Sequence, residues 1–339
     1  MKDITKWWLD YMPLSKKEQK LITQIRTSSP ILGSDEEFNL IEKEYFNRMP
    51  YCNISENTHH LTFSDCATNF INGLFDKYVD DETLVLYTNN EHDNVKKNLQ
   101  KCKNTLEVEY YPIIKPLKLQ NIINECKKYK KVFVYMIGTQ ISTGEITPQI
   151  FFEKLKQQLV YNKIDHTIVL DDVHGMFLVP RDYSLFDYII YTAHALIKHY
   201  DMGIMISKDR FMGIQAINWG KEYLEMLDVV LKRKEKLRIF PYVMKNEFYE
   251  ILLNEGFGIC EDTSPQIFSL KTNNIFYTKK MYDILDSYEV RVEGMEHTNK
   301  YLRFRAQQFI QYPENLNKGL EVVYNILSSA NITNNDEDK

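Results

Sequence analysis

Residues 166–175 read HTIVLDDVHG, an apolar run that ends abruptly in two aspartates and, three positions after the first of them, a histidine. A strand that is apolar throughout is typical of a parallel sheet buried on both faces. In such sheets ligands bind beyond the carboxyl ends of the strands. Asp171 and His174 are therefore candidate site residues. On this stretch alone, the ordinary alternative is a strand end with solvated carboxylates.

The same pattern recurs on both sides of this stretch, from about residue 61 to residue 208. Short apolar strands are predicted at 83–88, 107–113, 132–137, 166–171, 188–192 and 203–207. The helical spacing of apolar residues predicts helices between several of them, at 68–79, 93–103, 118–129 and 148–162. Strands that alternate with helices indicate an α/β protein with a mostly parallel sheet covered on both faces.

The composition excludes several classes of protein. The chain has 339 residues, of which 44% are hydrophobic, so its bulk is expected to fold. Its 42 lysines and arginines are outnumbered by 47 aspartates and glutamates, which gives a net charge of −5. We therefore expect no nucleic-acid partner and no polybasic membrane anchor. The sequence has no apolar run of about 18 residues, so no membrane-spanning helix is predicted.

Cysteine and histidine usage points away from metals and disulfides. The five cysteines include no CxxC motif, which predicts neither a disulfide framework nor a cysteine zinc site. The eight histidines form no HExxH motif, so no metal site is predicted. His59 and His60 are expected to be exposed in a polar loop. Because the first residues also lack the apolar stretch of a signal peptide, we expect a cytoplasmic protein.

Three further segments carry polar residues where a strand ends or a helix begins. Residues 186–195 (FDYIIYTAHA) form a strand that ends in a hydroxyl and an imidazole. Residues 87–94 (YTNNEHDN) place His92 at the start of a helix, where an ordinary capping role is the alternative. Residues 63–69 (FSDCATN) open a helix with small residues, and the exposed amides of such a helix start can bind an anion.

Taken together and in this order, these segments resemble the fold type I pyridoxal-phosphate (PLP) enzymes. The resemblance is to the branch of class V aminotransferases and cysteine desulfurases, and it covers roughly residues 60–210, with a looser match to about 327. It implies a PLP-dependent transferase fold, α/β, with a large PLP-binding domain and a small C-terminal α/β domain. It also implies a homodimer with the active site at the two-fold interface.

The resemblance divides the chain into four parts. Residues 1–45 are expected to form an N-terminal arm and helix, and 46–225 the PLP-binding large domain. Residues 226–330 are expected to form the small C-terminal domain, and the polar tail, 331–339, to be disordered.

The resemblance assigns roles residue by residue. It implies a set of ligands to the cofactor phosphate: Cys66 (where the family usually has Gly), Ala67, Thr68, Thr192 and His194. It implies a second set around the pyridine ring: His92 flat on the ring, Ser142, Thr143 and His174 near its O3′ side, and Asp171 paired with the ring nitrogen. The carboxylate is needed there because it keeps that nitrogen protonated, so that the ring accepts electron density from the substrate.

The sequence departs from the family at the residue after His194. At this position the family has a lysine, which forms the Schiff base with PLP. This chain has Ala195 there. Lys198 is the nearest alternative lysine. One interpretation is an engineered Lys-to-Ala substitution that traps the external aldimine. The other is a natural loss that leaves a non-catalytic PLP-fold binding protein. We favour the first, because the rest of the motif set is intact.

The expected reaction follows from the same resemblance. Residues 300–306 (KYLRFRA) match the family's segment that binds the substrate α-carboxylate, with Arg303 in register and Arg305 on the same side of the strand. A surface arginine is the alternative. Cys260 lies in an acidic setting that disfavours a reactive thiolate, which argues against desulfuration. We expect a biosynthetic aminotransferase for a free amino acid, with a lyase (β-elimination, retro-aldol or decarboxylation) as the alternative.

Overall fold

The fold is taken from a computed structural model. It describes residues 20, 31–49, 53–88, 91–108, 116–140, 143–176, 178–192, 202–211, 217–237, 245–246, 257–259, 267–272, 283, 301–305, 318, 321 and 325. The chain divides into two compact units, each described here by itself. The sheet unit comprises 16–140 and 146–231, and the second unit comprises 1–15, 141–145 and 232–339.

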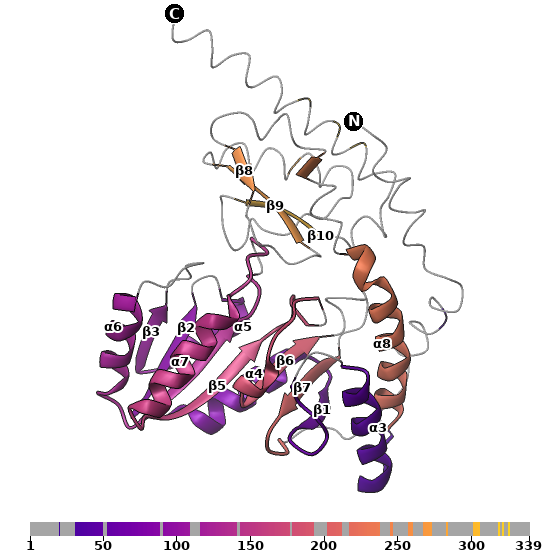
Figure 1. Ribbon diagram of the computed structural model, residues 1–339, viewed down its shortest axis with the longest axis horizontal. Helices are drawn as coiled ribbons and strands as arrows, with labels where there is room; N and C mark the ends of the chain where they lie inside the picture. Colours follow the sequence, from indigo (N-terminus) through magenta and orange to yellow (C-terminus); the bar gives the residue numbers. More distant parts are fainter. Residues whose placement is uncertain are drawn as a thin grey trace, which may run out of the picture. The chain divides into compact units, whose positions relative to one another are not determined.

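The sheet unit is built on a seven-stranded sheet (Figure 1). Its strands are β1 (His60–Ser64), β2 (Thr83–Thr88), β3 (Asn104–Val108), β4 (Lys131–Ile137), β5 (Asp165–Asp171), β6 (Tyr188–Thr192) and β7 (Gly203–Ser207). Their order is β1-β7-β6-β5-β4-β2-β3. The strands from β3 to β6 run parallel, and β7 is antiparallel to both of its neighbours. The predicted mostly parallel sheet is confirmed.

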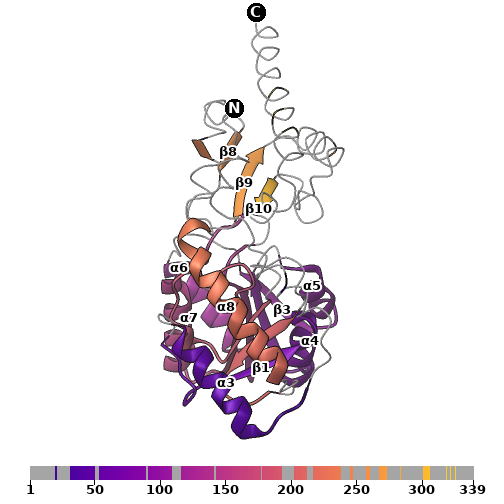
Figure 2. The same cartoon turned by 90° about the vertical axis from the view of Figure 1, so that its right-hand side faces the viewer.

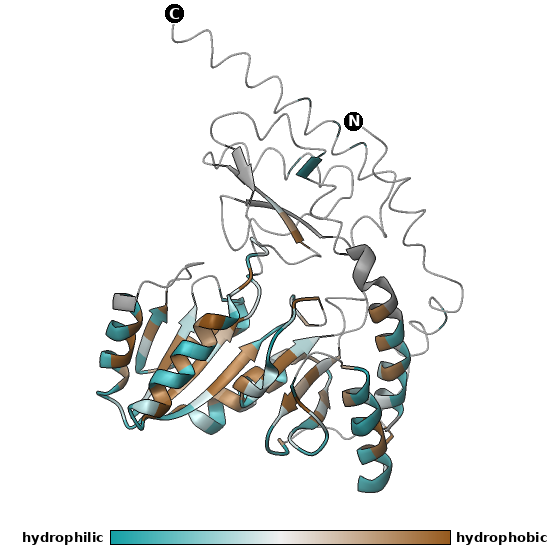
Figure 3. Ribbon diagram, in the orientation of Figure 1, coloured by the Kyte–Doolittle hydropathy of each residue, from teal (hydrophilic) through white to brown (hydrophobic). Residues whose placement is uncertain are grey.

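Helices cover both faces of this sheet. They are α3 (Asp35–Asn47), α4 (Ala67–Tyr78), α5 (Asp93–Leu99), α6 (Pro116–Cys126), α7 (Gln149–Tyr161) and α8 (Ile217–Leu237), with a 3-10 turn at Tyr183–Leu185. One buried cluster joins α4 and α5 to one face, and a larger one joins α3, α6, α7 and α8 to the other. Figure 2 shows α4 and α5 on the side of the sheet opposite α6 and α7. In Figure 3 the strands are largely hydrophobic and the helices carry a polar outer side.

The helix α3 illustrates how local sequence sets these elements. Ser34 accepts a hydrogen bond from the backbone N–H of Glu37, and the Glu37 side chain bonds back to the backbone of Ser34. This capping box satisfies two amide groups that the helix start leaves open. Apolar residues at helical spacing then bury one side of α3. At its end Tyr45 bonds through its hydroxyl to the hydroxyl of Tyr191 in β6, which ties the helix to the sheet.

Most predicted elements agree with the structure to within one or two residues, and four differ. The helix expected at 118–129 is α6, which ends three residues early, at Cys126. The strand expected at 107–113 is β3, which begins at Asn104 and ends at Val108 because it pairs with β2 along 84–88; residues 109–113 lie outside the described part. The helix expected to reach residue 103 ends at Leu99, since Gln100 caps it. The strand β1 was not predicted, because it is short and carries polar residues, Thr62 and Ser64, that are buried only through pairing with β7, which is distant in sequence.

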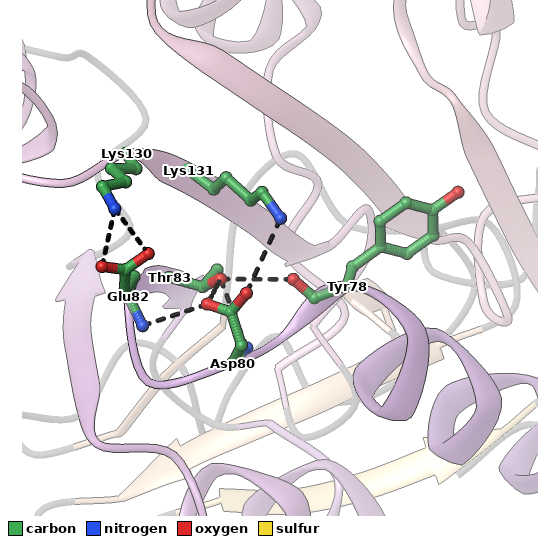
Figure 4. A network of polar contacts seen from close by, with 6 residues as sticks. All are labelled: Tyr78, Asp80, Glu82, Thr83, Lys130 and Lys131. Atoms are coloured by element: carbon green, nitrogen blue, oxygen red, sulfur yellow. Dashed lines mark hydrogen bonds and ion pairs between the residues drawn. The ribbon is translucent and has the colours of Figure 1, made fainter.

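The amino ends of β2 and β4 carry a solvated polar network (Figure 4). The Asp80 carboxylate accepts hydrogen bonds from the backbone N–H of Glu82 at 3.0 Å and from the Thr83 hydroxyl at 2.7 Å. Lys130 pairs with Glu82 at 2.7 Å, and Lys131 lies 3.6 Å from Asp80. These groups shape the turn that leads from α4 into β2. Exposed ion pairs of this kind add little stability.

The expectation for His59 and His60 is wrong. His60 is the first residue of β1, and the His59 side chain is 3% exposed. The strand β1 pairs with β7, and the pairing of His60 with Ser207 brings His59 beside Lys208, directly after the end of β7. Burial lowers the pKa of His59 to about 4, and the charge of Lys208 adds to the effect.

This burial predicts a pH-dependent stability. Between pH 6.5, the ordinary pKa of histidine, and about 4, the unfolded chain binds a proton at His59 that the folded chain does not. The free energy of unfolding should therefore fall as the pH drops through that window. We expect the wild type to lose about 1–2 kcal/mol more than His59→Gln between pH 7 and pH 5. Urea unfolding of both proteins at the two pH values measures this, and equal losses would contradict it.

The second unit contains a small antiparallel sheet. Its strands are β8 (Phe257–Ile259), β9 (Ile267–Thr272) and β10 (Tyr301–Arg305), in the order β10-β9-β8. Arg303 pairs with Ser269 and Arg305 with Ile267, so both arginines lie on one face of β10. The helical part predicted for this region lies largely outside the described residues. Within the described part of the chain, no helix is long and apolar enough to cross a membrane.

Candidate functional site

Alternation along the strands places two predicted residues on the same face and at the same edge of the sheet. Val169 in β5 and Ile190 in β6 belong to the cluster under α4 and α5. Asp171 and Thr192 follow them by two positions, so they lie on that face at the carboxyl ends of their strands. This is the edge at which ligands bind in open α/β sheets.

The helix α4 begins at this edge. Cys66 is its N-cap residue, and the Cys66 side chain makes no capping hydrogen bond. The Asn69 N–H donates to the carbonyl oxygen of Cys66, whereas the N–H groups of Ala67 and Thr68 have no acceptor among the described residues and can bind one from a ligand. A helix start with free N–H groups and the positive end of the helix dipole is a favourable place for phosphate.

Gly203 allows this helix start to approach the sheet. It is the first residue of β7 and pairs with Ser64 on one side and Thr192 on the other. A Cβ atom built on Gly203 would lie 2.4 Å from the backbone C of Cys66 and 2.5 Å from the backbone N of Ala67. Only glycine fits such a contact. The helix start and Thr192 are thus brought together through one backbone position.

The Thr192 hydroxyl is buried without a hydrogen-bond partner among the described residues, although the residue is only 4% exposed. Leaving a buried hydroxyl unpaired costs about 1–3 kcal/mol. An oxygen-rich ligand at the start of α4 would satisfy the hydroxyl and the open amide groups together. The residues present therefore fit a phosphate group.

Asp171 is buried and held rigidly at the same edge. The hydroxyl of Tyr135 in β4 donates to Asp171 Oδ2 at 2.8 Å, and the backbone N–H of Val173 donates to Oδ1 at 3.2 Å. Burial raises the pKa of Asp171, and the Tyr135 bond, the Val173 bond and the charge of His92 act in the opposite direction. Among the described residues, no basic side chain forms an ion pair with Asp171, and Arg181 pairs with Asp172 instead. A buried carboxylate of this kind favours a ligand that brings a positive charge.

The neighbouring Asp172 points to the opposite face and has its own partners. Arg181 Nε lies 3.3 Å from Asp172 Oδ1, and the Tyr183 hydroxyl donates to Oδ2 at 2.5 Å. Arg181 also donates to the carbonyl oxygens of Thr147, at 2.8 Å, and Gly138. This buried network joins the loops after β4 and β5. Asp172 is therefore a structural acid, and Asp171 is the one that faces the candidate site.

His92 and the helix α5 are tied to the start of α4. His92 is the N-cap of α5, and its Nδ1 accepts from the backbone N–H of Asn94 at 3.2 Å. The Asn94 side-chain amide donates to the Thr68 hydroxyl at 2.7 Å. One turn further on, Asn98 donates to Asn72 at 2.8 Å. The segment that carries His92 is thereby held in register with the helix start that carries Thr68.

The remaining predicted residues are placed less fully. His174 is buried in the turn that follows β5. The Thr143 hydroxyl donates to Glu145 Oε2 at 2.9 Å, and Thr143 belongs to the second unit. Arg303 and Arg305 lie on β10 of that unit, and only their backbone is described. Ser142, His194, Ala195 and Lys198 lie outside the described residues.

Three residues at this edge were missed by sequence reasoning. Tyr135 sits within an apolar strand run, and only the hydrogen bond of its hydroxyl to Asp171, on the neighbouring strand β5, reveals a polar role. Gly203 looked like an ordinary strand start. Glu91, next to His92 in the sequence, is 1% exposed. An acidic residue three positions after the end of a buried strand was the one available signal for Glu91.

Comparison with known proteins identifies the fold. No protein-family model matches this sequence, and no curated protein matches it. Among solved structures, a NifS-like protein from Rickettsia africae ESF-5 is similar with a TM-score of 0.67 and 11% identity, covering 94% of this chain and 98% of that chain. The PLP-bound C–S lyase from Staphylococcus hominis gives 0.68 and 12%, covering 94% and 90%. Aspartate aminotransferase from Rhizobium meliloti gives 0.67 and 10%, covering 94% and 89%.

At this level of identity the similarity concerns the fold. The chain has the α/β fold shared by the NifS-like protein, the PLP-bound C–S lyase and the aspartate aminotransferase, the fold type I architecture. The predicted fold class is confirmed.

Proposed function

We propose that this chain binds pyridoxal 5′-phosphate at the carboxyl edge of its sheet and acts on a free amino acid, with amino-group transfer as the reaction. The observation that carries the proposal is one juxtaposition. A buried, anchored carboxylate, Asp171, shares a sheet face and edge with the start of α4 and with the Thr192 hydroxyl, which has no hydrogen-bond partner among the described residues. PLP has a basic ring nitrogen and a phosphate, which match these two features.

The phosphate would be held by the helix start. The N–H groups of Ala67 and Thr68 and the hydroxyl of Thr192 supply the donors, and Asn94 fixes the orientation of Thr68. Cys66 contributes backbone in place of the family's usual glycine, and the resemblance adds His194. Donors fixed by the fold bind phosphate without a large ordering cost, because they are already in position.

Asp171 would hold the ring. Its carboxylate keeps a bound pyridine nitrogen protonated, and Tyr135 keeps the carboxylate in place. PLP, when bound, supplies a protonated ring that draws electrons from the substrate carbon next to the amino group. His92, fixed at the start of α5, would pack on the ring. On the resemblance alone we add Ser142, Thr143 and His174 for its O3′ side.

The substrate class follows from amino-group transfer. An amino acid and a 2-oxo acid exchange their amino and oxo groups, so that a second 2-oxo acid and a second amino acid are produced. On the resemblance we assign the substrate carboxylate to Arg303 or Arg305, since a guanidinium binds a carboxylate through two parallel hydrogen bonds. On the same ground we propose a cytoplasmic homodimer, with a PLP-binding domain over 46–225 and a smaller domain over 226–330.

Ala195 sets the present chain apart from an active enzyme. A lysine at this position would both bind the cofactor covalently and move protons during the reaction. With alanine there, the chain is proposed to bind PLP and an amino acid without turnover. The same observation supports a second candidate, a non-catalytic PLP-fold binding protein. The likeness to a C–S lyase supports a third, a lyase.

One experiment separates these functions. Ala195→Lys and the present chain are each given PLP, treated with borohydride and weighed by mass spectrometry, and then assayed with a panel of amino acids. We expect the lysine form to gain the mass of the reduced cofactor at residue 195 and to need a 2-oxo acid for repeated turnover. Ammonia with a shortened product would instead indicate a lyase. PLP binding without any turnover by the lysine form would favour the binding protein, and no PLP binding by either form would refute the proposal.

A further inference from the structure

Besides Asp172, which pairs with Arg181, two buried carboxyl groups of the described residues lie at the carboxyl edge of the sheet, and the proposed function uses only one of them. Asp171 is 7% exposed and is the last residue of β5, and Glu91 is 1% exposed and lies after the end of β2. The strand β4, which carries Tyr135, lies between β2 and β5 in the sheet. The charges of Asp171 and Glu91 both raise the pKa of Tyr135, and the charge of Asp171 also raises the pKa of Glu91. The two acids therefore share one low-dielectric region.

Among the described residues, only one of the two oxygens of the Glu91 carboxyl accepts hydrogen bonds. The Thr88 hydroxyl donates to Glu91 Oε1 at 2.5 Å, and the Thr88 backbone N–H donates to the same oxygen at 3.2 Å. The other oxygen, Oε2, is buried without a hydrogen-bond partner among the described residues. A carboxylate oxygen without donors is poorly stabilised as an anion, whereas a protonated oxygen carries less charge to stabilise.

No basic side chain of the described residues forms an ion pair with either Glu91 or Asp171, in contrast to the Arg181 partner of Asp172. The groups that face Glu91 are the carboxyl of Asp171, the phenols of Tyr135 and Tyr87, and the ammonium of Lys96 at a distance. Lys96 is itself paired with Asp93 at 3.7 Å. Burial is the largest effect that raises the pKa of Glu91, and the charge of Asp171 adds to it.

We propose that Glu91 is a second acid of the cofactor site, which holds a proton while the site is empty and releases it to solvent when a ring with a protonated nitrogen binds beside Asp171. This inference rests on the proposed function. In the step, the O–H bond of the Glu91 carboxyl breaks and the proton passes to water, while the ring nitrogen keeps its own proton. The positive ring offsets the repulsion between two carboxylates, so both can be ionised. Glu91 is a positioning residue, since it acts on the ring through the charge of the pocket.

The test counts protons. Pyridoxamine 5′-phosphate, which has no aldehyde to react with surface lysines, is titrated by calorimetry into the wild type and Glu91→Gln. The titrations use buffers of different ionisation enthalpy, over about pH 5.5 to 8. We expect the wild type to release up to about one proton more than the variant, and to bind more tightly by about tenfold at the upper end of this range. Glu82→Gln, at the exposed amino end of β2, should match the wild type.

Equal proton release by the wild type and Glu91→Gln at every pH would overturn the inference and leave the proposed function intact. Thr88→Val gives an independent check, because it removes the hydroxyl that stabilises the Glu91 anion. It should move the pH of largest proton release upward, and an unchanged profile would count against the inference.

A second measurement needs no cofactor. The infrared spectrum of the empty protein at the acidic end of the titrated range should contain the band of a buried protonated carboxyl that is missing from Glu91→Gln. Its absence from the wild type would overturn the inference. If that band is present but pyridoxamine 5′-phosphate does not bind the wild type, the proposed function fails, and the coupling proposed for Glu91 falls with it.

Discussion

Asp171→Asn, made together with Ala195→Lys, is expected to lower kcat/KM for the amino acid substrate by about a thousandfold, or about 4 kcal/mol. The amide has nearly the shape of the carboxylate and keeps a place beside Tyr135. It has no negative charge, so a bound pyridine nitrogen loses its proton and the ring withdraws electrons less strongly. Steady-state kinetics measures the fall, and the absorption spectrum of the bound cofactor reports the ring's change.

This loss should not come from unfolding. Burial raises the pKa of Asp171, which means that the folded protein is less stable with the carboxylate charged than it would be with a neutral group there. A neutral amide removes that penalty, so the empty variant should stay within about 1 kcal/mol of the wild type in unfolding free energy. A variant that keeps full activity would show that Asp171 does not hold the ring.

Asp172→Asn is the matched control one residue along the chain. Its carboxylate faces the other side of the sheet and neutralises the buried Arg181. Removing one member of a buried ion pair typically costs about 3–5 kcal/mol. We therefore expect a marked loss of stability with an unchanged spectrum of bound cofactor in the folded fraction, the opposite of the result at Asp171.

Gly203→Ala is the second substitution with a large expected effect. The added methyl group would lie 2.4–2.6 Å from backbone atoms of Cys66 and Ala67, and backbone cannot turn aside as a flexible side chain can. The start of α4 has to move away from β7, at a cost of about 3 kcal/mol. Because the proposed phosphate donors move with it, PLP affinity should fall by about tenfold or more. Urea unfolding and PLP titration measure the two effects.

Gly73→Ala is its control, within the same helix. There the added methyl group meets the ring of Phe211 at 3.3 Å, and alanine is a better helix former than glycine. Stability should change by no more than about 1 kcal/mol, with PLP affinity unaltered. If Gly203→Ala behaves like Gly73→Ala, the close approach between β7 and α4 does not position the site.

The sequence allowed much of the fold to be predicted because β2 and β4 to β7 are short runs that are apolar on both sides. It also pointed to Asp171, Thr192 and His92, since each stands where a buried run ends or a helix begins. The pattern of apolar residues did not predict β1, because its polar residues Thr62 and Ser64 are buried only through pairing with β7. It failed as well at His59, because pairing between strands far apart in sequence buried a residue that is polar in isolation.

The sequence by itself determined the alternation of strands and helices, and hence a sheet covered on both faces with polar residues at its carboxyl edge. Local runs of apolar residues are enough to predict this alternation, because burying apolar surface away from water is favourable wherever the run lies in the chain. Only the tertiary structure decided that Asp171 faces α4 and α5 while Asp172 is neutralised by Arg181. Only the structure brought Gly203, Thr192 and the start of α4 together and buried Glu91 near Asp171. These outcomes depend on strand order, register and helix packing, which join residues that no local pattern connects.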